Sequence, residues 1–237
     1  MPESGLIDSS ALPAVDVASD APAPPWEIGE ALVQHITFEI PVPNARRNLP
    51  DIVTRSAPTY GRVSMIDRSD SPVGPYREAL LMVGCRVGII PALYVVDAVV
   101  NSVAARDAIA AHWRYLPSVG EINVQRDDDA ITSSFDVGDG LTVTLHSPTT
   151  DAAAVAIVRY DPLLVVQPSN GSGAASEIPC EHDVRQAWLS RSSTLSYDGG
   201  SRRHPWIQLR SSNAITAVAA VEGQTIEAAA AIELPGR

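Results

Sequence analysis

The sequence has 237 residues, of which 45% are hydrophobic and 19% are charged, and its mean hydropathy is +0.04. A chain of this length can bury one substantial core, so the composition is typical of a folded globular domain. The formal net charge of −11 would repel a phosphate backbone, because nucleic-acid binding depends on a basic face, and we therefore expect no nucleic-acid partner.

The chain begins with a segment, residues 1–25, that is rich in Pro, Ala, Ser and Asp and carries four acidic and no basic side chains. It can bury too little apolar surface to offset the entropy of ordering, so we expect a disordered arm followed by one domain over residues 26–237. The sequence shows no secretory-signal pattern and no apolar run near the ~20 residues of a membrane span. We therefore expect a cytoplasmic protein without a membrane partner.

From Trp26 the chain is a succession of short stretches that are rich in β-branched residues and bounded by Pro, Gly, Asn and Ser, which predicts strands. The first four predicted strands cover residues 32–42, 62–67, 77–87 and 92–100. One helix follows at about 101–112, because Asn101 or Ser102 can cap its N-terminus and Pro117 ends the turn.

After the helix the pattern returns to strands. We predict strands over 121–126, 130–137, 141–147, 152–160 and 162–168. A polar loop at about 168–176, a short helix at 183–191 and a terminal hairpin turning at Glu222 and Gly223 complete the chain. The predicted fold class is mainly β (α+β), an antiparallel cone or barrel with a few peripheral helices, since closure removes exposed strand edges.

The stretch SPVGPYREALLMV, residues 71–83, places the carboxylate of Glu78 where an apolar run begins. Together with YVVDAVVNSVAARDAI, residues 94–109, it resembles the acetoacetate decarboxylase family, whose members have a Gly-x-Tyr-x-Glu segment entering a strand. The matching positions are Gly74, Tyr76 and Glu78 in the first element and Asp97, Arg106 and Asp107 in the second. The resemblance implies a large β cone around an apolar cavity, a homo-oligomer, and a Glu78 side chain that points into the cavity. The alternative is that Glu78 only pairs with a nearby arginine.

One departure from this family concerns its chemistry. The family's decarboxylases use a lysine that forms a Schiff base with a β-keto acid, and the protonated imine accepts the electrons as carbon dioxide leaves. All seventeen basic side chains of this sequence are arginine. Counting from Arg106, the family's basic pair falls on Trp113 and Arg114, and neither side chain can form an imine. Schiff-base decarboxylation is therefore the least expected reaction.

The candidate site combines possible acid–base groups with possible ligand contacts. The proposed catalytic groups are Glu78, Tyr76 and His112, and the proposed substrate-binding groups are Trp113, Arg114 and Leu93. Trp113 could instead be a core residue, and Arg114 could form a surface ion pair. The two cysteines and five histidines show no metal-ligand spacing, so we expect two free thiols, no metal and no cofactor.

Two classes of function remain open. The first is a lysine-independent isomerase, cyclase or dehydratase that acts on a polyketide-like carbonyl compound in bacterial secondary metabolism, with Glu78 as acid or base. The arginine- and alanine-rich composition hints at a bacterial source of high GC content. The second is a non-catalytic protein that binds a small apolar ligand. A structural subunit of an oligomer is a weaker third interpretation.

Overall fold

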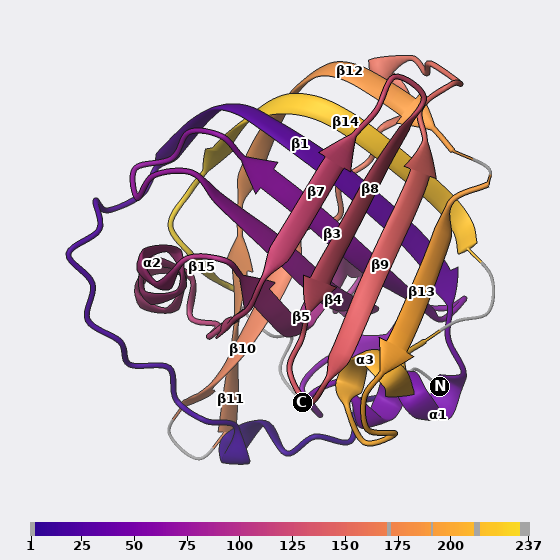
Figure 1. Ribbon diagram of the computed structural model, residues 1–237. Coiled ribbons are helices and arrows are strands. Elements are labelled where there is room, and N and C mark those ends of the chain that lie inside the picture. The colour runs from indigo at the N-terminus through magenta and orange to yellow at the C-terminus, as the bar shows by residue number, and fades with distance from the viewer. Residues whose placement is uncertain (1–2, 170–171, 191, 211–213, 233–237) are drawn as a thin grey trace.

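The computed structural model describes residues 3–169, 172–190, 192–210 and 214–232 (Figure 1). The larger of its two sheets contains β1 (Trp26–Glu39), β2 (Thr54–Arg55), β3 (Tyr60–Arg68), β4 (Tyr76–Val87), β5 (Ile90–Val100), β6 (Ser118–Val119), β10 (Leu163–Ser169), β11 (Ser172–Ile178), β12 (Cys180–Leu189), β14 (Ala214–Ile226) and β15 (Ala230–Ile232). The smaller sheet contains β7 (Ile122–Arg126), β8 (Ala130–Asp136), β9 (Leu141–Pro148) and β13 (Thr194–Gly199). The helices are α1 (Val42–Arg47), α2 (Val103–Trp113) and α3 (Pro205–Gln208), with 3-10 turns η1 (Ser9–Ala11) and η2 (Val155–Ile157).

The larger sheet is long and curved, and the smaller sheet lies across it (Figure 1). The strand order of the larger sheet is β12-β14-β1-β3-β4-β5-β10-β11-β15, with β2 beside β4 and β6 beside β5. Pairing is antiparallel except where β5 meets β10 and β6. The mainly β class with a few helices is therefore confirmed. In the described part of the chain β12 and β15 end the sheet, so it is an open curved sheet that only approximates a closed cone or barrel.

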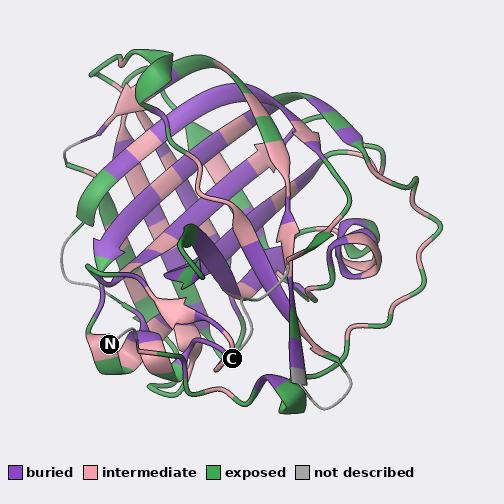
Figure 2. Cartoon of the chain, turned by 180° about the vertical axis from the view of Figure 1, so that it is seen from behind, coloured by how far each residue is buried: buried purple, intermediate pink, exposed green. Residues whose placement is uncertain are grey.

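The central strand β4 of the larger sheet has two buried faces. Successive side chains of a strand point to opposite sides, so in β4 Leu81 and Val83 join a core cluster that faces the smaller sheet, whereas Leu80 and Met82 join a second cluster on the concave side. Figure 2 shows the buried residues along these strands in purple. Because both faces are buried, β4 is an almost continuous apolar run.

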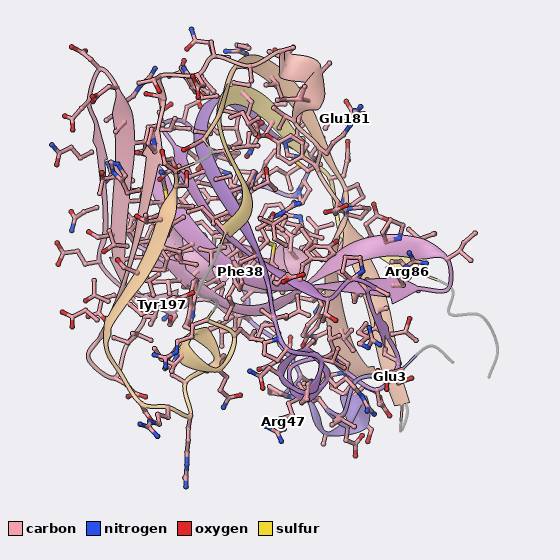
Figure 3. The ribbon with its side chains drawn as sticks, turned by 90° about the vertical axis from the view of Figure 1, so that its right-hand side faces the viewer. Glu3, Phe38, Arg47, Arg86, Glu181 and Tyr197 are labelled. Atoms are coloured by element: carbon pink, nitrogen blue, oxygen red, sulfur yellow. The ribbon has the colours of Figure 1, made fainter. Side chains whose placement is uncertain are left out.

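The first core cluster fills the space between the two sheets. Phe38 of β1 is 1% exposed and belongs to it together with Phe135 of β8 and Trp206 of α3, whose ring centroids lie 5.2 Å apart. Figure 3 shows Phe38 in the interior, whereas Arg47 and Arg86 lie at the margin of the molecule. This packing fixes one side of the large sheet and leaves the concave side to form the site.

The helix expected at about 101–112 is confirmed as α2. Ser102 is its N-cap and accepts a hydrogen bond from the backbone of Ala105 at 3.3 Å. Arg114 ends the helix in the left-handed conformation with φ 64°. The buried face of α2, including Ile109 and Trp113, packs on the concave cluster, so this helix covers one end of the concave side. No helix in the described ranges is long and apolar enough to cross a membrane.

Three local predictions near the C-terminus are wrong, and strand pairing is the reason in each. The predicted helix at 183–191 is, up to Leu189, part of β12, which pairs with β14; residue 191 lies outside the described residues. The predicted loop at 168–176 is mostly the hairpin β10–β11, whose residues 170–171 are not described. The predicted terminal hairpin is instead one strand, β14, and β15 pairs with β11. Residues 233 and 234 of that hairpin lie outside the described residues.

Other local differences concern short elements. The strand predicted over 152–160 is irregular and contains only the turn η2. The strand β13 and the helices α1 and α3 have no counterpart among the predicted elements. Long-range pairing gives β13 its structure, since its partner in the smaller sheet is β9.

The segment before β1 runs along the outside of the domain (Figure 1). The backbone nitrogen of Gly5 donates to the carbonyl oxygen of Val53 at 3.1 Å, and the carboxylate of Glu3 lies 2.7 Å from Nε of Arg55. These contacts join residues 3–5 to β2 and to the residue that precedes it. The division into a disordered arm and a domain stays a prediction.

Candidate functional site

A cavity of about 160 Å³ lies on the concave side of the large sheet. For comparison, an engineered apolar protein cavity of about 150 Å³ holds one benzene ring. Most of the wall is apolar and includes Val33, Leu80, Met82, Leu93, Trp113 and Leu163. The cavity therefore has room for a compact molecule of about one ring.

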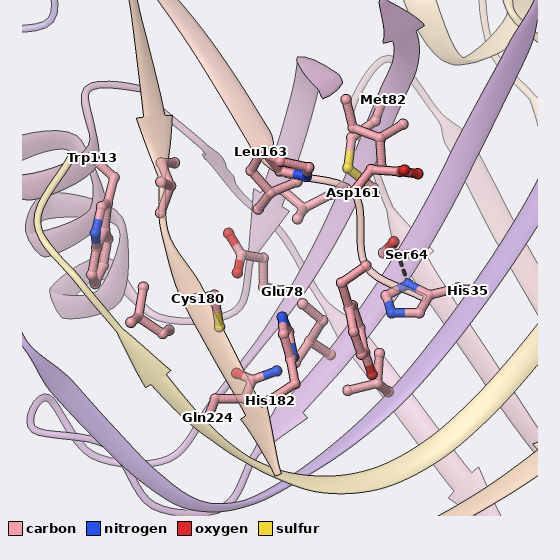
Figure 4. Close-up of a pocket in the computed structure, with 18 of the residues that line it drawn as sticks. His35, Ser64, Glu78, Met82, Trp113, Asp161, Leu163, Cys180, His182 and Gln224 are labelled. Carbon is pink, nitrogen blue, oxygen red and sulfur yellow. Dashed lines mark hydrogen bonds between the residues drawn. The ribbon is translucent and has the colours of Figure 1, made fainter. Parts of the chain in front are cut away.

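Glu78 points into this cavity from β4, between Trp113 and His35 in the view of Figure 4. The residue is 2% exposed. Its Oε2 accepts a hydrogen bond from Nη1 of Arg68 at 2.7 Å, and its Oε1 accepts one from the hydroxyl of Tyr115 at 2.5 Å. Glu78 thus faces the cavity and pairs with an arginine at the same time, with both carboxylate oxygens occupied.

Arg68 is the buried cation of the cavity wall. It lies on β3 with 6% of its side chain exposed, and its Nε donates to Oε1 of Gln224 at 2.9 Å. Its guanidinium also lies 5.1 Å from the ring centroid of Tyr76, a cation–π distance. Burial alone would lower the pKa of Arg68, but Tyr76 and Glu78 raise it above its ordinary value, so the side chain stays charged.

Both tyrosines beside Glu78 remain hydroxyl donors. Burial, followed by the charge of Glu78, holds the pKa of Tyr115 well above its usual range. Burial is also the largest cause that raises the pKa of Tyr76, partly opposed by Arg68. This end of the cavity therefore combines a fixed positive charge with two neutral phenols.

A second polar cluster lies on β12, β14 and the segment before β10. The carboxylate of Glu222, which is 0% exposed, accepts from Nδ1 of His182 at 2.8 Å, from Nε2 of Gln224 at 2.8 Å and from the hydroxyl of Tyr160. The ring of Tyr160 stacks on that of His182 with centroids 3.5 Å apart and planes 1° apart. His182 and Tyr160 line the cavity, whereas Glu222 lies behind them.

His35 of β1 lies next to the stacked rings of Tyr160 and His182. Its Nδ1 lies 2.6 Å from Oγ of Ser64, as the dashed line in Figure 4 marks, and its ring meets Tyr160 edge-on at 5.4 Å. Burial, and then the charge of Arg62, lower the pKa of His35 well below its usual range. His35 is therefore neutral at pH 7, and its buried Nε2 has no hydrogen-bond partner in the described residues.

Four of the six predicted site residues line the cavity: Tyr76, Glu78, Leu93 and Trp113. Trp113 also packs in the core, meeting Trp26 edge-on at 4.8 Å and donating to the carbonyl oxygen of Glu227 at 2.7 Å. The other two are not brought to it. His112 lies beside Trp26, with ring centroids 6.1 Å apart, and Arg114 is exposed and lines a second hollow of about 220 Å³ next to Val15.

Several polar residues of the wall have no counterpart in the sequence-based prediction. They include Arg68, Tyr115, Tyr160, His182 and Gln224 in the wall, and Glu222 lies directly behind it. One signal was present for the last two, because a Glu and a Gln interrupt the otherwise small and apolar stretch AITAVAAVEGQTI. A turn was the simpler explanation, since Glu222 is followed by Gly223. In the described part of the chain no group of three or more His, Cys, Asp or Glu side chains is placed to hold a metal ion.

Comparison with known proteins identifies the fold. No protein-family model and no curated protein matches the sequence. Acetoacetate decarboxylase from Legionella pneumophila superimposes with a TM-score of 0.79 at 15% identity, over 97% of this chain and 96% of that one. The enduracididine biosynthesis enzyme MppR, in complex with pyruvate, gives 0.72 at 13% identity, over 92% of this chain and 98% of that one. An acetoacetate decarboxylase-like enzyme from Sphingomonas wittichii superimposes with a TM-score of 0.71 at 13% identity, over 93% of this chain and 100% of that one.

These superpositions cover nearly the whole chain, so the protein has the acetoacetate decarboxylase fold. The resemblance seen in residues 71–109 is thereby confirmed at the level of the fold. At such low identity the likeness concerns the fold alone.

Proposed function

We propose that this protein is a lysine-independent enzyme that enolises a small carbonyl compound in the cavity, as the first step of an isomerisation, dehydration or cyclisation. The observation that carries the proposal is the buried ion pair of Arg68 and Glu78 at the wall of a mostly apolar cavity, in a chain without lysine. A buried charge in such a site interacts far more strongly with a developing charge than it would in water.

Arg68 takes the part that an imine would have in Schiff-base chemistry. When a proton leaves the carbon next to a carbonyl group, negative charge develops on the carbonyl oxygen. A guanidinium that already faces the cavity stabilises this enolate oxygen without forming a covalent bond. The hydroxyl of Tyr115, kept protonated by its raised pKa, donates its single hydrogen to Glu78 and so fixes the carboxylate that holds Arg68.

The predicted residues that line the cavity receive defined roles in this proposal. Glu78 holds Arg68 and Tyr115 in place and keeps the pair electrically balanced. Tyr76 supports the guanidinium through its ring face. Trp113 and Leu93 form the apolar wall against which the carbon skeleton packs. His112 and Arg114 have no role, because they do not reach the cavity.

The substrate is a compact carbonyl compound, and a polyketide-like compound of about one ring would fit the volume of the cavity. Structures of MppR contain pyruvate and the condensation product of pyruvate and imidazole 4-carboxaldehyde, which supports a small carbonyl ligand on this fold. We further propose that the protein is a bacterial, cytoplasmic homo-oligomer and that it acts in natural-product biosynthesis.

The test is the exchange of carbon-bound hydrogen in heavy water, followed by proton NMR. The probes are pyruvate, 2-oxobutanoate and cyclohexanone, whose hydrogens next to the carbonyl group exchange only when an enol or enolate forms. We expect the protein to accelerate exchange of at least one probe. Arg68→Met should slow this exchange about 100-fold or more, the usual effect of removing one oxyanion donor. Arg185→Met is the matched control, because Arg185 is an exposed arginine whose ion-pair partner in the described residues is Asp183.

Two results would contradict the proposal. One is a wild-type exchange rate equal to that of Arg68→Met for all three probes, with both proteins folded by circular dichroism. The other is a covalent adduct with pyruvate that borohydride traps within the domain, since this would restore imine chemistry. Binding of cyclohexanone without exchange would support the alternative function, a non-catalytic apolar ligand-binding protein, which the fully hydrogen-bonded Glu78 favours.

A further inference from the structure

Glu222 is a buried carboxylate that the proposed function leaves unused. It is 0% exposed and accepts hydrogen bonds from His182, Gln224 and Tyr160. No arginine contacts it in the described part of the chain. Apolar side chains of similar volume are often at least as stable at such a position, because removing a carboxylate from water is costly. Stability therefore does not explain this cluster.

The hydrogen bond to Glu222 decides which nitrogen of His182 carries hydrogen. A carboxylate can only accept, so Nδ1 of His182 holds the hydrogen that spans the 2.8 Å to Glu222. In the neutral ring Nε2 then keeps its lone pair. Nε2 has no hydrogen-bond partner among the described residues, and the parallel ring of Tyr160 at 3.5 Å fixes the plane of the imidazole. His182 thus presents a basic nitrogen at the cavity wall.

Gln224 connects this histidine to the cation of the proposed site. Its Nε2 donates to Glu222 at 2.8 Å, and its Oε1 accepts from Nε of Arg68 at 2.9 Å. One amide orientation satisfies both bonds, so the base and the oxyanion donor are held by a single continuous chain of hydrogen bonds. Figure 4 shows Glu78 and His182 facing the same space, with Gln224 beside His182.

We propose that His182 is the general base of this cavity and that Glu222 is its positioning residue, an inference that rests on the proposed function. Nε2 of His182 takes a proton from the carbon next to the carbonyl group. The electron pair of that C–H bond becomes the C=C bond of the enolate, and the carbonyl oxygen, now negative, is stabilised by Arg68. Return of the proton from Nε2 to carbon completes exchange or isomerisation. In dehydration the enolate returns to a carbonyl group while a C=C bond forms to the next carbon. The C–O bond of a hydroxyl group on that carbon breaks, and the proton on Nε2 joins the leaving hydroxide as water.

The tautomer of His182 can be measured without any activity. In protein labelled with ¹⁵N-histidine, NMR distinguishes a protonated ring nitrogen from one with a lone pair, and the spectrum of His182→Gln identifies the signals of this residue. We expect hydrogen on Nδ1 and a lone pair on Nε2 in the neutral ring, and an increased Nε2–H population in Glu222→Gln. A neutral His182 with hydrogen mainly on Nε2 in the wild type would overturn the assignment.

The exchange assay provides the second test, with the probe that the wild type turns over fastest among pyruvate, 2-oxobutanoate and cyclohexanone. We expect His182→Gln to lower the exchange rate at saturation about 100-fold or more, with little change in the probe concentration needed for half-saturation. Glu222→Gln should lower the same rate at least about tenfold. Asp183→Asn is the matched control on the same strand, because its side chain is 77% exposed, and it should exchange at the wild-type rate.

The outcomes separate the two proposals. If the wild type exchanges a probe and Arg68→Met does not, but His182→Gln retains the full rate, the assignment of His182 fails and the proposed function stands. If the wild type exchanges none of the probes, the proposed function fails. Tyr160→Phe guards against a folding effect, because it keeps the stacked ring and removes only the hydroxyl that donates to Glu222; it should remain folded and exchange at a rate between wild type and Glu222→Gln.

Discussion

The ion pair of Arg68 and Glu78 should show strong energetic coupling, and a double-mutant cycle can measure it. The two side chains are 6% and 2% exposed and meet at 2.7 Å. Removing one partner leaves the other charge buried and unpaired, which costs about 3–5 kcal/mol in the free energy of unfolding. We expect this loss for Arg68→Met and for Glu78→Leu separately, so additive effects would sum to about 6–10 kcal/mol.

The double variant should lose much less. It buries no unpaired charge, and its main loss is the hydrogen-bond partner of two polar groups, the hydroxyl of Tyr115 and Oε1 of Gln224. At about 1–2 kcal/mol for each group, the double variant should lose about 2–4 kcal/mol. The expected coupling between the two residues is therefore about 2–8 kcal/mol, with a central value of about 5 kcal/mol.

Urea unfolding at pH 7 of the wild type, the two single variants and the double variant measures these free energies. The comparison requires that the slope of the free energy of unfolding against urea concentration is the same for all four proteins. The exposed pair of Asp183 and Arg185, at 3.2 Å, is the control and should show a coupling of about 0–1 kcal/mol. Additivity of the two buried substitutions within about 0.5 kcal/mol would refute the reasoning, because it would mean that the charges are not buried against each other.

Three further predictions concern other parts of the molecule. The folded-state pKa of His35 lies well below 6.5, so the unfolded chain binds one more proton than the folded protein as the pH falls below about 6.5. The free energy of unfolding should therefore decrease with falling pH by up to about 1.4 kcal/mol per pH unit. Unfolding curves of His35→Gln should lack this contribution, and an unchanged pH dependence in this variant would contradict the prediction. A Cβ atom at Gly84 would lie 2.4 Å from the ring of Tyr60, so Gly84→Ala should lower the free energy of unfolding by about 1–3 kcal/mol, and an unchanged urea midpoint would argue against this close approach. Burial of Cys85 and partial burial of Cys180 raise the pKa of each thiol to about 12, so both should react with a disulfide reagent at pH 8 far more slowly in the folded protein than in urea. Equal rates in the two conditions would contradict this protection.

Most of the secondary structure in the region that resembles the acetoacetate decarboxylase family could be predicted from the sequence. The predicted strands over 62–67, 77–87 and 92–100 correspond to β3, β4 and β5, and the helix to α2. The absence of lysine excludes an imine with a side-chain amine on composition alone, because that conclusion depends only on which functional groups the chain contains. Local pattern was insufficient near the C-terminus, where β12 resembles a helix and β14 contains the turn-like pair of Glu222 and Gly223.

The sequence by itself determined the mainly β class, the point at which Glu78 enters a strand and the need for chemistry without a lysine amine. Only the tertiary structure decided what surrounds Glu78. Arg68 and Gln224 are 156 positions apart, and Tyr160 and Glu222 are 62 apart, yet each pair is joined by a hydrogen bond. Strand order and register bring them together, and these depend on pairing between distant segments, about which the residues of one strand carry almost no information.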